Sequence, residues 1–215
     1  MAVDRGMLVL FEGVDRSGKT TQSALLRDRL AEGGCKVELI RFPDRNTRMG
    51  KVIDSYLSST NGEDDLDDRA IHLLFSANRW EVAQKIKELL LRGVTVIMDR
   101  YAHSGAAYTM AKGGFSLEWC CACDRGLPEP DQIFYLDVPV DVAEARGDFG
   151  KERYEQSAFQ RRVYRAYQDV MERSKNVRII NGAEGVDQIH QMLYGYFCVL
   201  STAFADQKLG KLWEE

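Results

Sequence analysis

The sequence lacks an excess of positive charge, a long hydrophobic run and a proline-rich linker, and each absence narrows what the chain can be. Its 29 lysine and arginine residues are outnumbered by 33 acidic residues, so no overall positive field attracts nucleic acid. The first apolar run, residues 7–11, is too short for a secretory signal or a membrane span. We therefore expect a cytoplasmic protein that binds neither nucleic acid nor a membrane.

Internal repeats and low-complexity tracts are also missing, which bears on domain organisation. The chain has 215 residues, of which 45% are hydrophobic, and only four prolines. A chain of this length and composition can bury a sizeable core. We expect one domain that spans residues 1–215.

Cysteine is scarce and odd in number. The five cysteines stand in a chain in which we see no export signal, which favours reduced thiols. Cys120 and Cys123 have the C-x-x-C spacing, with Cys121 between them, but no second cysteine pair or histidine cluster accompanies them. We interpret them as buried or surface thiols and not as a zinc or redox site.

What the sequence does contain is the stretch Gly13-Val14-Asp15-Arg16-Ser17-Gly18-Lys19-Thr20, which matches G-x-x-x-x-G-K-[ST] at every fixed position. Its glycines let successive N–H groups turn inward, and the helix that follows adds its positive end, so the loop predicts a nest for phosphate oxygens. Lys19 is expected to reach the β and γ phosphates of a nucleoside triphosphate. The Thr20 hydroxyl can take one position on Mg²⁺.

Apolar runs and helical patterns alternate along the chain. The runs cover residues 7–11, 37–42, 94–98, 133–138 and 177–180. The clearest helical patterns cover 68–91, 156–174 and 186–200, and shorter helices are expected after the phosphate loop and at 139–145. This alternation predicts an α/β fold with a parallel sheet covered by helices on both faces. Together with the phosphate loop it indicates a three-layer P-loop NTPase fold with a five-stranded sheet. In such folds ligands gather at the carboxyl ends of the strands.

Charged and aromatic residues occupy those positions. Arg45 follows the second run, and Asp99 and Arg100 follow the third. On the helix at 68–91, Arg79 follows Phe75 by four residues, so the two side chains share a face and can clamp a flat base. Taken alone, Phe75 is better explained as a core residue, because apolar stripes usually face the core. Two glycines among dense charge at residues 146–154 indicate a mobile lid, at about 142–157.

These pieces resemble thymidylate kinases of the eukaryotic type, within the phosphate-loop nucleoside monophosphate kinase family. The matching blocks run in family order over nearly the whole chain, at residues 12–23, 41–45, 72–81, 99–105, 127–131 and 149–155. The resemblance implies a five-stranded parallel sheet and a homodimer. It also implies transfer of the γ-phosphoryl group of ATP to dTMP, giving dTDP and ADP.

The resemblance also implies residue roles on the acceptor side. Arg45 and Arg100 would bind the phosphate of dTMP. Phe75 would lie against thymine, with Arg79 at the base edge. The expected dTMP-binding set is Asp15 (at the 3'-hydroxyl), Phe42, Arg45, Phe75, Arg79, Arg100, Ser104, Gly105, Tyr108 (crowding a ribose 2'-hydroxyl) and Tyr154.

On the donor side the resemblance implies a set centred on the phosphate loop, with Arg146 from the lid. The expected ATP-binding residues are Gly13, Arg16, Ser17, Gly18, Lys19, Thr20, Thr21 and Arg146. Thr20 and Asp99 would hold Mg²⁺, Asp99 through water. The residues expected to carry catalysis are Lys19, Arg16, Arg100 and Asp15.

Three other functions are weighed against this one. In a deoxynucleoside kinase, Asp44 would act as a general base toward a sugar hydroxyl, but Arg45 would then have no phosphate to bind. A uridylate or adenylate kinase, or another pyrimidine nucleoside monophosphate kinase, would share the phosphate loop but not the combination of residues 75–79 with residues 99–101. A nucleotide-dependent switch is disfavoured, because the guanine-specific N-K-x-D is missing and the acceptor-side arginines would be unexplained. His103 and residues 121–123 depart from the family pattern, and the loop at 181–184 matches it only loosely.

Overall fold

The computed structural model describes residues 5–59, 65–146, 152–204 and 207–214. Its strands and helices alternate as the sequence predicts, although three helices were not anticipated. The strands are β1 (Leu8–Glu12), β2 (Val37–Arg41), β3 (Thr95–Asp99), β4 (Gln132–Asp137) and β5 (Val177–Asn181). The helices are α1 (Lys19–Glu32), α2 (Arg48–Ser58), α3 (Asp68–Leu91), α4 (Ala102–Lys112), α5 (Leu117–Ala122), α6 (Val140–Glu144), α7 (Ser157–Arg173) and α8 (Val186–Phe204).

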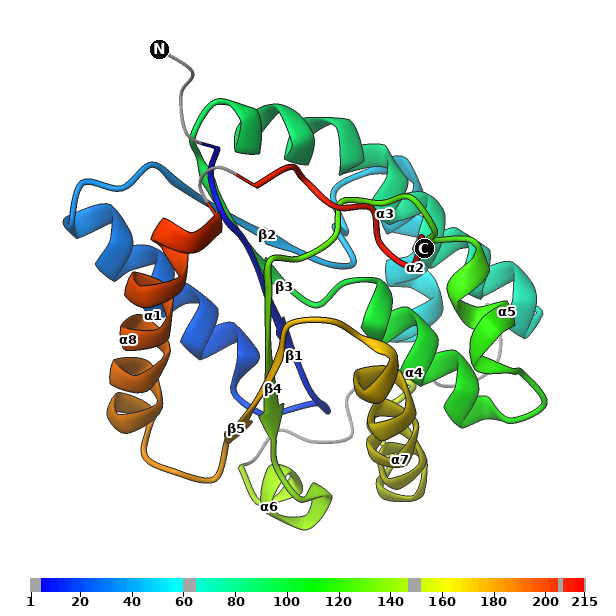
Figure 1. Cartoon of the computed structure of the whole chain (residues 1–215). Coiled ribbons are helices and arrows are strands. Elements are labelled where there is room, and N and C mark those ends of the chain that lie inside the picture. Colours follow the sequence, from blue (N-terminus) through cyan, green and yellow to red (C-terminus); the bar gives the residue numbers. More distant parts are fainter. Residues whose placement is uncertain (1–4, 60–64, 147–151, 205–206, 215) are drawn as a thin grey trace.

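The five strands form one parallel sheet in the order β2-β3-β1-β4-β5. Helices α1 and α8 cover one face of it, and α3, α4 and α7 lie on the other face (Figure 1). This arrangement confirms the expected three-layer fold. Because every strand runs in the same direction, all five carboxyl ends open at the same end of the sheet.

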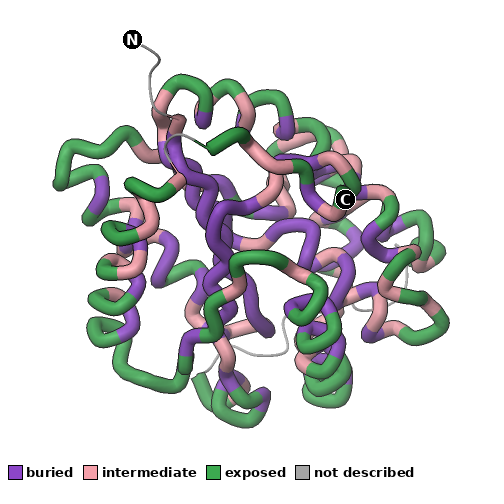
Figure 2. Tube along the Cα trace, viewed as in Figure 1, coloured by how far each residue is buried: buried purple, intermediate pink, exposed green. Residues whose placement is uncertain are grey.

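Strand β1 lies at the centre of the sheet, and all five of its residues are buried. Successive side chains of a strand point to opposite faces. Leu8 and Leu10 therefore join the core under α3, α4 and α7, whereas Val9 and Phe11 join the core under α1 and α8. Figure 2 shows this buried interior running along the middle strands. A strand buried on both faces appears in sequence as a continuous apolar run, which explains why residues 7–11 are apolar throughout.

The helices that the sequence did not reveal are α2, α4 and α5. Helix α4 is rich in alanine and small polar residues, so it has no strong apolar stripe to recognise. Helix α2 has a clear N-cap, in which Thr47 accepts a hydrogen bond from the Gly50 amide at 2.9 Å. A Cβ added at Gly50 would lie 1.8 Å from the Asp44 carbonyl oxygen. Gly50 thus lets α2 pack directly on the turn that carries Arg45.

Two general features complete the fold. Within the described ranges, no helix is both long and apolar enough to cross a bilayer. All five cysteines lie in those ranges, and none of them forms a disulfide. Residues 147–151 of the expected lid lie outside the described residues.

Candidate active site

The phosphate loop joins β1 to α1 at the carboxyl end of the sheet. Gly13 and Gly18 have φ angles of 145° and 100°, a region that favours glycine, and Arg16 is also left-handed at 64°. Lys19 is buried, and its Nζ donates to the Val14 carbonyl at 2.6 Å and to Ser17 Oγ at 3.2 Å. Burial and the positive charge of Arg100 lower the pKa of Lys19 to about 7. The strand–loop–helix context that the motif requires is therefore present.

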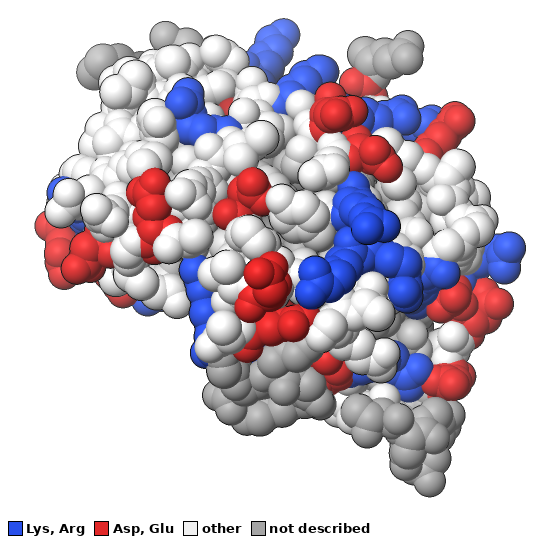
Figure 3. Space-filling model, turned by 90° about the horizontal axis from the view of Figure 1, so that it is seen from below, with Lys and Arg blue, Asp and Glu red and all other residues white. Residues whose placement is uncertain are grey.

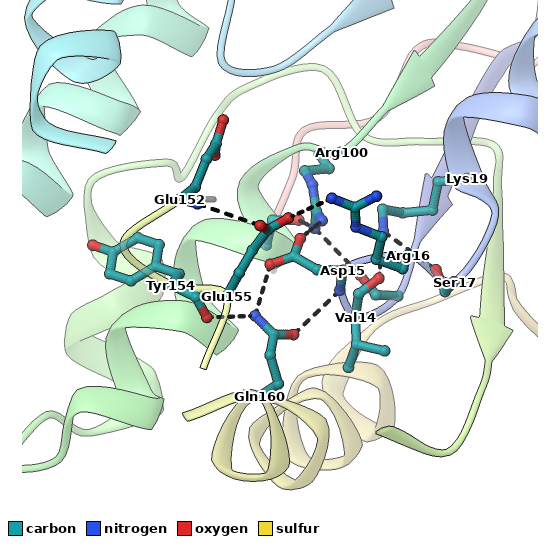
Figure 4. Close-up of polar contacts among 12 residues, drawn as sticks. Val14, Asp15, Arg16, Ser17, Lys19, Arg100, Glu152, Tyr154, Glu155 and Gln160 are labelled. Atoms are coloured by element: carbon teal, nitrogen blue, oxygen red, sulfur yellow. Dashed lines mark hydrogen bonds and ion pairs between the residues drawn. The ribbon is translucent and has the colours of Figure 1, made fainter. Parts of the chain in front are cut away.

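Arg100 lies where β3 ends, and its side chain turns back toward the phosphate loop. Its own backbone is left-handed, with φ at 70°. Nη2 forms an ion pair with Asp15 (Figure 4). Nη1 donates to the Gly13 carbonyl at 3.2 Å. Gln160 of α7 donates to Asp15 Oδ2 at 2.7 Å and accepts from the Asp15 amide at 3.2 Å. Two residues of the predicted catalytic set thus share a network that α7 supports.

The buried carboxylate of Glu12 binds backbone amides at the start of α4. Glu12 ends β1, is fully buried, and accepts from the amides of Tyr101 and Ser104 at 2.9 and 3.1 Å. Its second oxygen accepts from Ser104 Oγ at 2.6 Å and from the Tyr167 hydroxyl at 2.8 Å. Burial raises the pKa of Glu12 above its usual value, against the lowering effect of Arg100. The carboxylate satisfies amides at the N-terminus of α4 and so sets the turn that carries Arg100.

Thr20 and Asp99 meet at the expected metal position. Thr20 Oγ1 donates to Asp99 Oδ2 at 2.6 Å, and Arg41 Nε lies 3.0 Å from the same oxygen. Among the described residues, no group of three or more His, Cys, Asp or Glu side chains could hold a metal ion by itself. One carboxylate beside one hydroxyl fits Mg²⁺ bound mainly through nucleotide phosphates and waters, which is how Mg²⁺ usually binds.

Three other arginines of the site, Arg16, Arg45 and Arg146, also pair with acidic side chains or with carbonyl oxygens. Arg45 donates to Asp54 and to Glu152, both at 2.6 Å. Arg16 donates to Glu155 at 3.1 Å, which ties the phosphate loop to the described end of the expected lid. Arg146 donates to the carbonyls of Arg16 and Gly182 at 3.1 and 2.6 Å.

Aromatic side chains and one buried arginine line the opposite side of the same space. Phe75 is half-buried, and Tyr154 stacks on Phe159 with ring centroids 5.1 Å apart. Arg79 lies on α3 and forms a buried ion pair with Asp124 at 2.6 Å. Burial acts against the charge of Arg79, but Asp124 offsets this effect, and the pKa of Arg79 is raised.

These side chains surround one cavity of about 1280 Å³. Figure 3 looks onto the end where the strands terminate, and Lys and Arg side chains gather near the centre of that face. Apart from Gly13, whose carbonyl binds Arg100, every predicted site residue lines the cavity. They are Asp15, Arg16, Ser17, Gly18, Lys19, Thr20, Thr21, Phe42, Arg45, Phe75, Arg79, Asp99, Arg100, Ser104, Gly105, Tyr108, Arg146 and Tyr154. What each of them binds stays a prediction.

The residues that depart from the family pattern lie mostly away from this cavity. His103 is fully buried and packs on Trp213 with ring centroids 5.3 Å apart, and burial lowers its pKa to about 3. Cys121 is buried, and Cys123 Sγ lies 3.2 Å from His72 Nε2. By contrast, Gly182 and Glu184 of the loosely matching loop do line the cavity.

Sequence reasoning missed four polar residues that hold the site together: Glu12, Asp124, Gln160 and Tyr167. Glu12 had a detectable signal, because a charged residue that ends an apolar strand is unusual in a core. Asp124 had none, since it follows a short helix that the apolar pattern did not reveal. Gln160 and Tyr167 lie on a predicted helix, but nothing in the helical pattern shows which element they face.

Comparisons with known proteins agree with this geometry. A family model described as thymidylate kinase matches residues 11–193. A thymidylate kinase of Homo sapiens is 43% identical over 215 residues, covering 100% of both chains. One of Danio rerio is 43% identical over 214 residues, covering 99% of this chain and 100% of its own. The solved thymidylate kinase of Candida albicans, described as having broad substrate specificity, superposes with a TM-score of 0.86 at 36% identity, covering 96% of this chain and 98% of its own.

Proposed function

Because the chain belongs to the thymidylate kinase family, we propose that its cavity holds ATP on the phosphate loop and dTMP between Arg100 and the Phe75–Arg79 side. The chain transfers the γ-phosphoryl group of ATP to dTMP, giving dTDP and ADP. One observation carries the placement of the two nucleotides. Arg100 binds the carbonyl of Gly13 in the phosphate loop and also lines the space that Arg45, Phe75 and Arg79 enclose.

The acceptor chemistry explains why cations dominate the site. The phosphate of dTMP is already ionised near neutral pH, so the reaction needs no strong general base and depends on positioning and charge stabilisation. We propose that Arg45 and Arg100 hold the acceptor phosphate. Lys19, Arg16 and Arg100 then stabilise the charge that develops on the transferring group. Asp15 orients Arg100 through their ion pair and contacts the sugar 3'-hydroxyl.

Mg²⁺ fits the pair formed by Thr20 and Asp99. We propose that the Thr20 hydroxyl binds the ion directly and that Asp99 binds it through water. When bound, the ion neutralises charge on the β and γ phosphates. The hydrogen bond of 2.6 Å between the two side chains supports a shared ligand position.

The lid is proposed to cover residues 142–157 of a single domain spanning 1–215. The described part of this segment supports the idea, since Glu152 and Glu155 already reach Arg45 and Arg16. Such a lid would exclude water, which competes with dTMP as an acceptor. Arg146 lies beside the phosphate loop and is proposed to contact ATP.

A homodimer is proposed through the outer face of α3. Leu73, Trp80 and Leu91 are 51%, 40% and 66% exposed, and their spacing of seven and eleven residues places them on one side of the helix. An apolar stripe on the surface of a helix favours a protein partner.

We also propose a cytoplasmic location, which the free cysteines support, because thiols stay reduced there.

A coupled assay of ADP release tests the proposed acceptor site. dTMP, dUMP, UMP, dGMP and thymidine are compared as acceptors with ATP as the donor. We expect dTMP to give the highest kcat/KM and thymidine to be inert. Turnover of thymidine without turnover of dTMP would overturn the assignment and favour the deoxynucleoside kinase.

A further inference from the structure

The guanidinium of Arg79 is held by a carboxylate that belongs to no recognised motif. Nε donates to Asp124 Oδ1 at 3.0 Å, and Nη2 donates to Oδ2 at 2.6 Å. The side chains are 3% and 0% exposed. Two parallel hydrogen bonds of this kind fix the plane of the guanidinium as well as its position.

A glycine forms the second wall around Arg79. A Cβ added at Gly105 would lie 2.8 Å from Nη2 and 3.1 Å from Nη1 of Arg79, so only a residue without a side chain leaves room for the guanidinium. Nη1 forms no hydrogen bond with the part of the chain that the structure describes. Since Arg79 lines the cavity, the N–H groups of Nη1 are the ones left to a ligand.

Asp124 cannot follow Arg79 if the arginine moves, because its own loop is anchored. Ser76 Oγ donates to Asp124 Oδ1 at 2.8 Å, and Trp80 Nε1 donates to the Cys123 carbonyl at 2.8 Å. Farther along the loop, the Gly126 amide donates to the Leu212 carbonyl at 3.0 Å. Helix α3 and the C-terminal segment therefore both hold the loop that supplies the carboxylate.

We propose that Asp124 determines base specificity by fixing Arg79 as a hydrogen-bond donor of one orientation. Arginine has N–H donors and no acceptor. A base with a carbonyl oxygen at that edge, such as thymine, satisfies the fixed donors, whereas the amino group of cytosine opposes them with its own donors. An arginine free to swing aside would let water separate the two and would reject cytosine less well. The inference rests on the proposed placement of Arg79 at the base edge.

The test measures kcat/KM for dTMP and for dCMP in the full-length chain carrying Asp124→Asn. Asparagine keeps the size of the side chain but removes one of the two acceptor oxygens. We expect the ratio of the two kcat/KM values, dTMP over dCMP, to fall at least about tenfold, within the range that one base contact contributes. The KM for ATP should stay within about twofold, because Asp124 does not line the cavity.

Asp131→Asn is the matched control. Asp131 also forms a buried bidentate pair, with Nη1 and Nη2 of Arg5 at 2.7 and 2.6 Å, and is 6% exposed. It directly precedes β4 and accepts from the Leu8 amide at the start of β1, away from the cavity. We expect this variant to lower Tm without changing the dTMP to dCMP ratio. If Asp124→Asn behaves in the same way, Asp124 only stabilises the fold and the inference is overturned. Should Asp124→Asn not fold, Gly105→Ala displaces the same guanidinium and must lower the ratio.

Arg79→Gln separates this inference from the function on which it rests. If Arg79→Gln leaves the ratio unchanged, the placement of Arg79 at the base is wrong and both proposals fall. If it lowers the ratio and Asp124→Asn does not, only the role of Asp124 is overturned. Because Asp124 acts through Arg79, the double variant should match Arg79→Gln alone, and independent losses at the two positions would contradict the inference.

Discussion

Arg45, Arg79 and Arg100 each contact a carboxylate, but the three pairs differ in a way that matters for function. The partners of Arg45 are Asp54 and Glu152, whose side chains are 45% and 38% exposed, so an incoming phosphate can replace them at little cost. The partner of Arg79, Asp124, is fully buried and out of reach of solvent. Arg100 lies between these extremes, since Asp15 is 20% exposed and belongs to the site itself.

Arg100→Ala is expected to lower kcat/KM for dTMP by about 10³-fold, because an arginine that stabilises phosphoryl transfer contributes at least this much. The Kd for ATP should change little, since Lys19 and the loop amides remain. Steady-state kinetics and calorimetric titration with a non-hydrolysable ATP analogue measure the two quantities. Equal weakening of both nucleotides would count against the assignment of Arg100 to the acceptor.

Lys19 provides a pH-dependent prediction at the same scale. Its pKa of about 7 lies below the usual value of 10.5, so the amine is largely neutral at pH 8 in the free protein. Binding of ATP places anionic phosphates beside it, which favours the charged form and raises the pKa. We expect uptake of up to about one proton per ATP bound at pH 8 and little uptake at pH 6.

Calorimetric titrations in two buffers of different ionisation enthalpy measure this uptake. Lys19→Arg is the control, because a guanidinium stays charged throughout this range and exchanges no proton. If the control takes up as many protons as the unaltered chain, another group is responsible.

At the scale of elements, the site depends on short segments that pack closely on the sheet. Helix α2 approaches the turn after β2 through Gly50 and thereby places Asp54 against Arg45. Glu12 accepts a hydrogen bond from the Ser104 amide in the first turn of α4, and Gln160 of α7 donates one to Asp15. Helix α4 lines the cavity with Ser104 and Tyr108, whereas α2 and α7 act on it indirectly, through Asp54 on Arg45 and Gln160 on Asp15. Displacing any of these helices therefore displaces a group of the site.

Gly50→Ala tests this dependence. The added methyl group meets the Asp44 carbonyl at 1.8 Å, so α2 must shift away from the turn that carries Arg45. We expect a loss of about 1–3 kcal/mol in the free energy of unfolding and a several-fold higher KM for dTMP. Urea unfolding and steady-state kinetics measure the two effects.

Gly195→Ala on α8 is the matched control, because nothing lies within 4 Å of the added methyl group. Alanine stabilises a helix interior relative to glycine by up to about 1 kcal/mol, so this variant should be slightly more stable and fully active. An unchanged KM for dTMP in Gly50→Ala would show that α2 does not position Arg45.

At the scale of the whole molecule, the parallel sheet brings distant segments to one end and leaves the outer face of α3 exposed. Arg100 and Asp15 are separated by 85 residues and meet there, as do Gln160 and Asp15, which are 145 residues apart. The exposed apolar side of α3 is not part of the site where these residues meet. It is the surface on which the proposed homodimer depends.

Leu73→Glu is expected to convert a dimer into a monomer. Leu73 is 51% exposed at the proposed interface, where a charge would be desolvated without a partner. Sedimentation velocity at several protein concentrations measures the change. Val199→Glu is the control, since Val199 is 73% exposed on α8, and it should leave the dimer intact. A monomeric unaltered chain would contradict the proposal directly.

Local patterns in the sequence predicted the strands, the long helices and the phosphate loop, and the family resemblance predicted most of the other residues that line the cavity. This was possible because strand burial and the phosphate nest depend on neighbouring residues along the chain. Only the tertiary structure decided which groups hold those residues in place. Glu12 meets Ser104 across 92 positions and Asp124 meets Arg79 across 45, and neither contact leaves a periodic signal in the chain. A buried polar group needs a partner somewhere, but packing alone determines which residue that partner is.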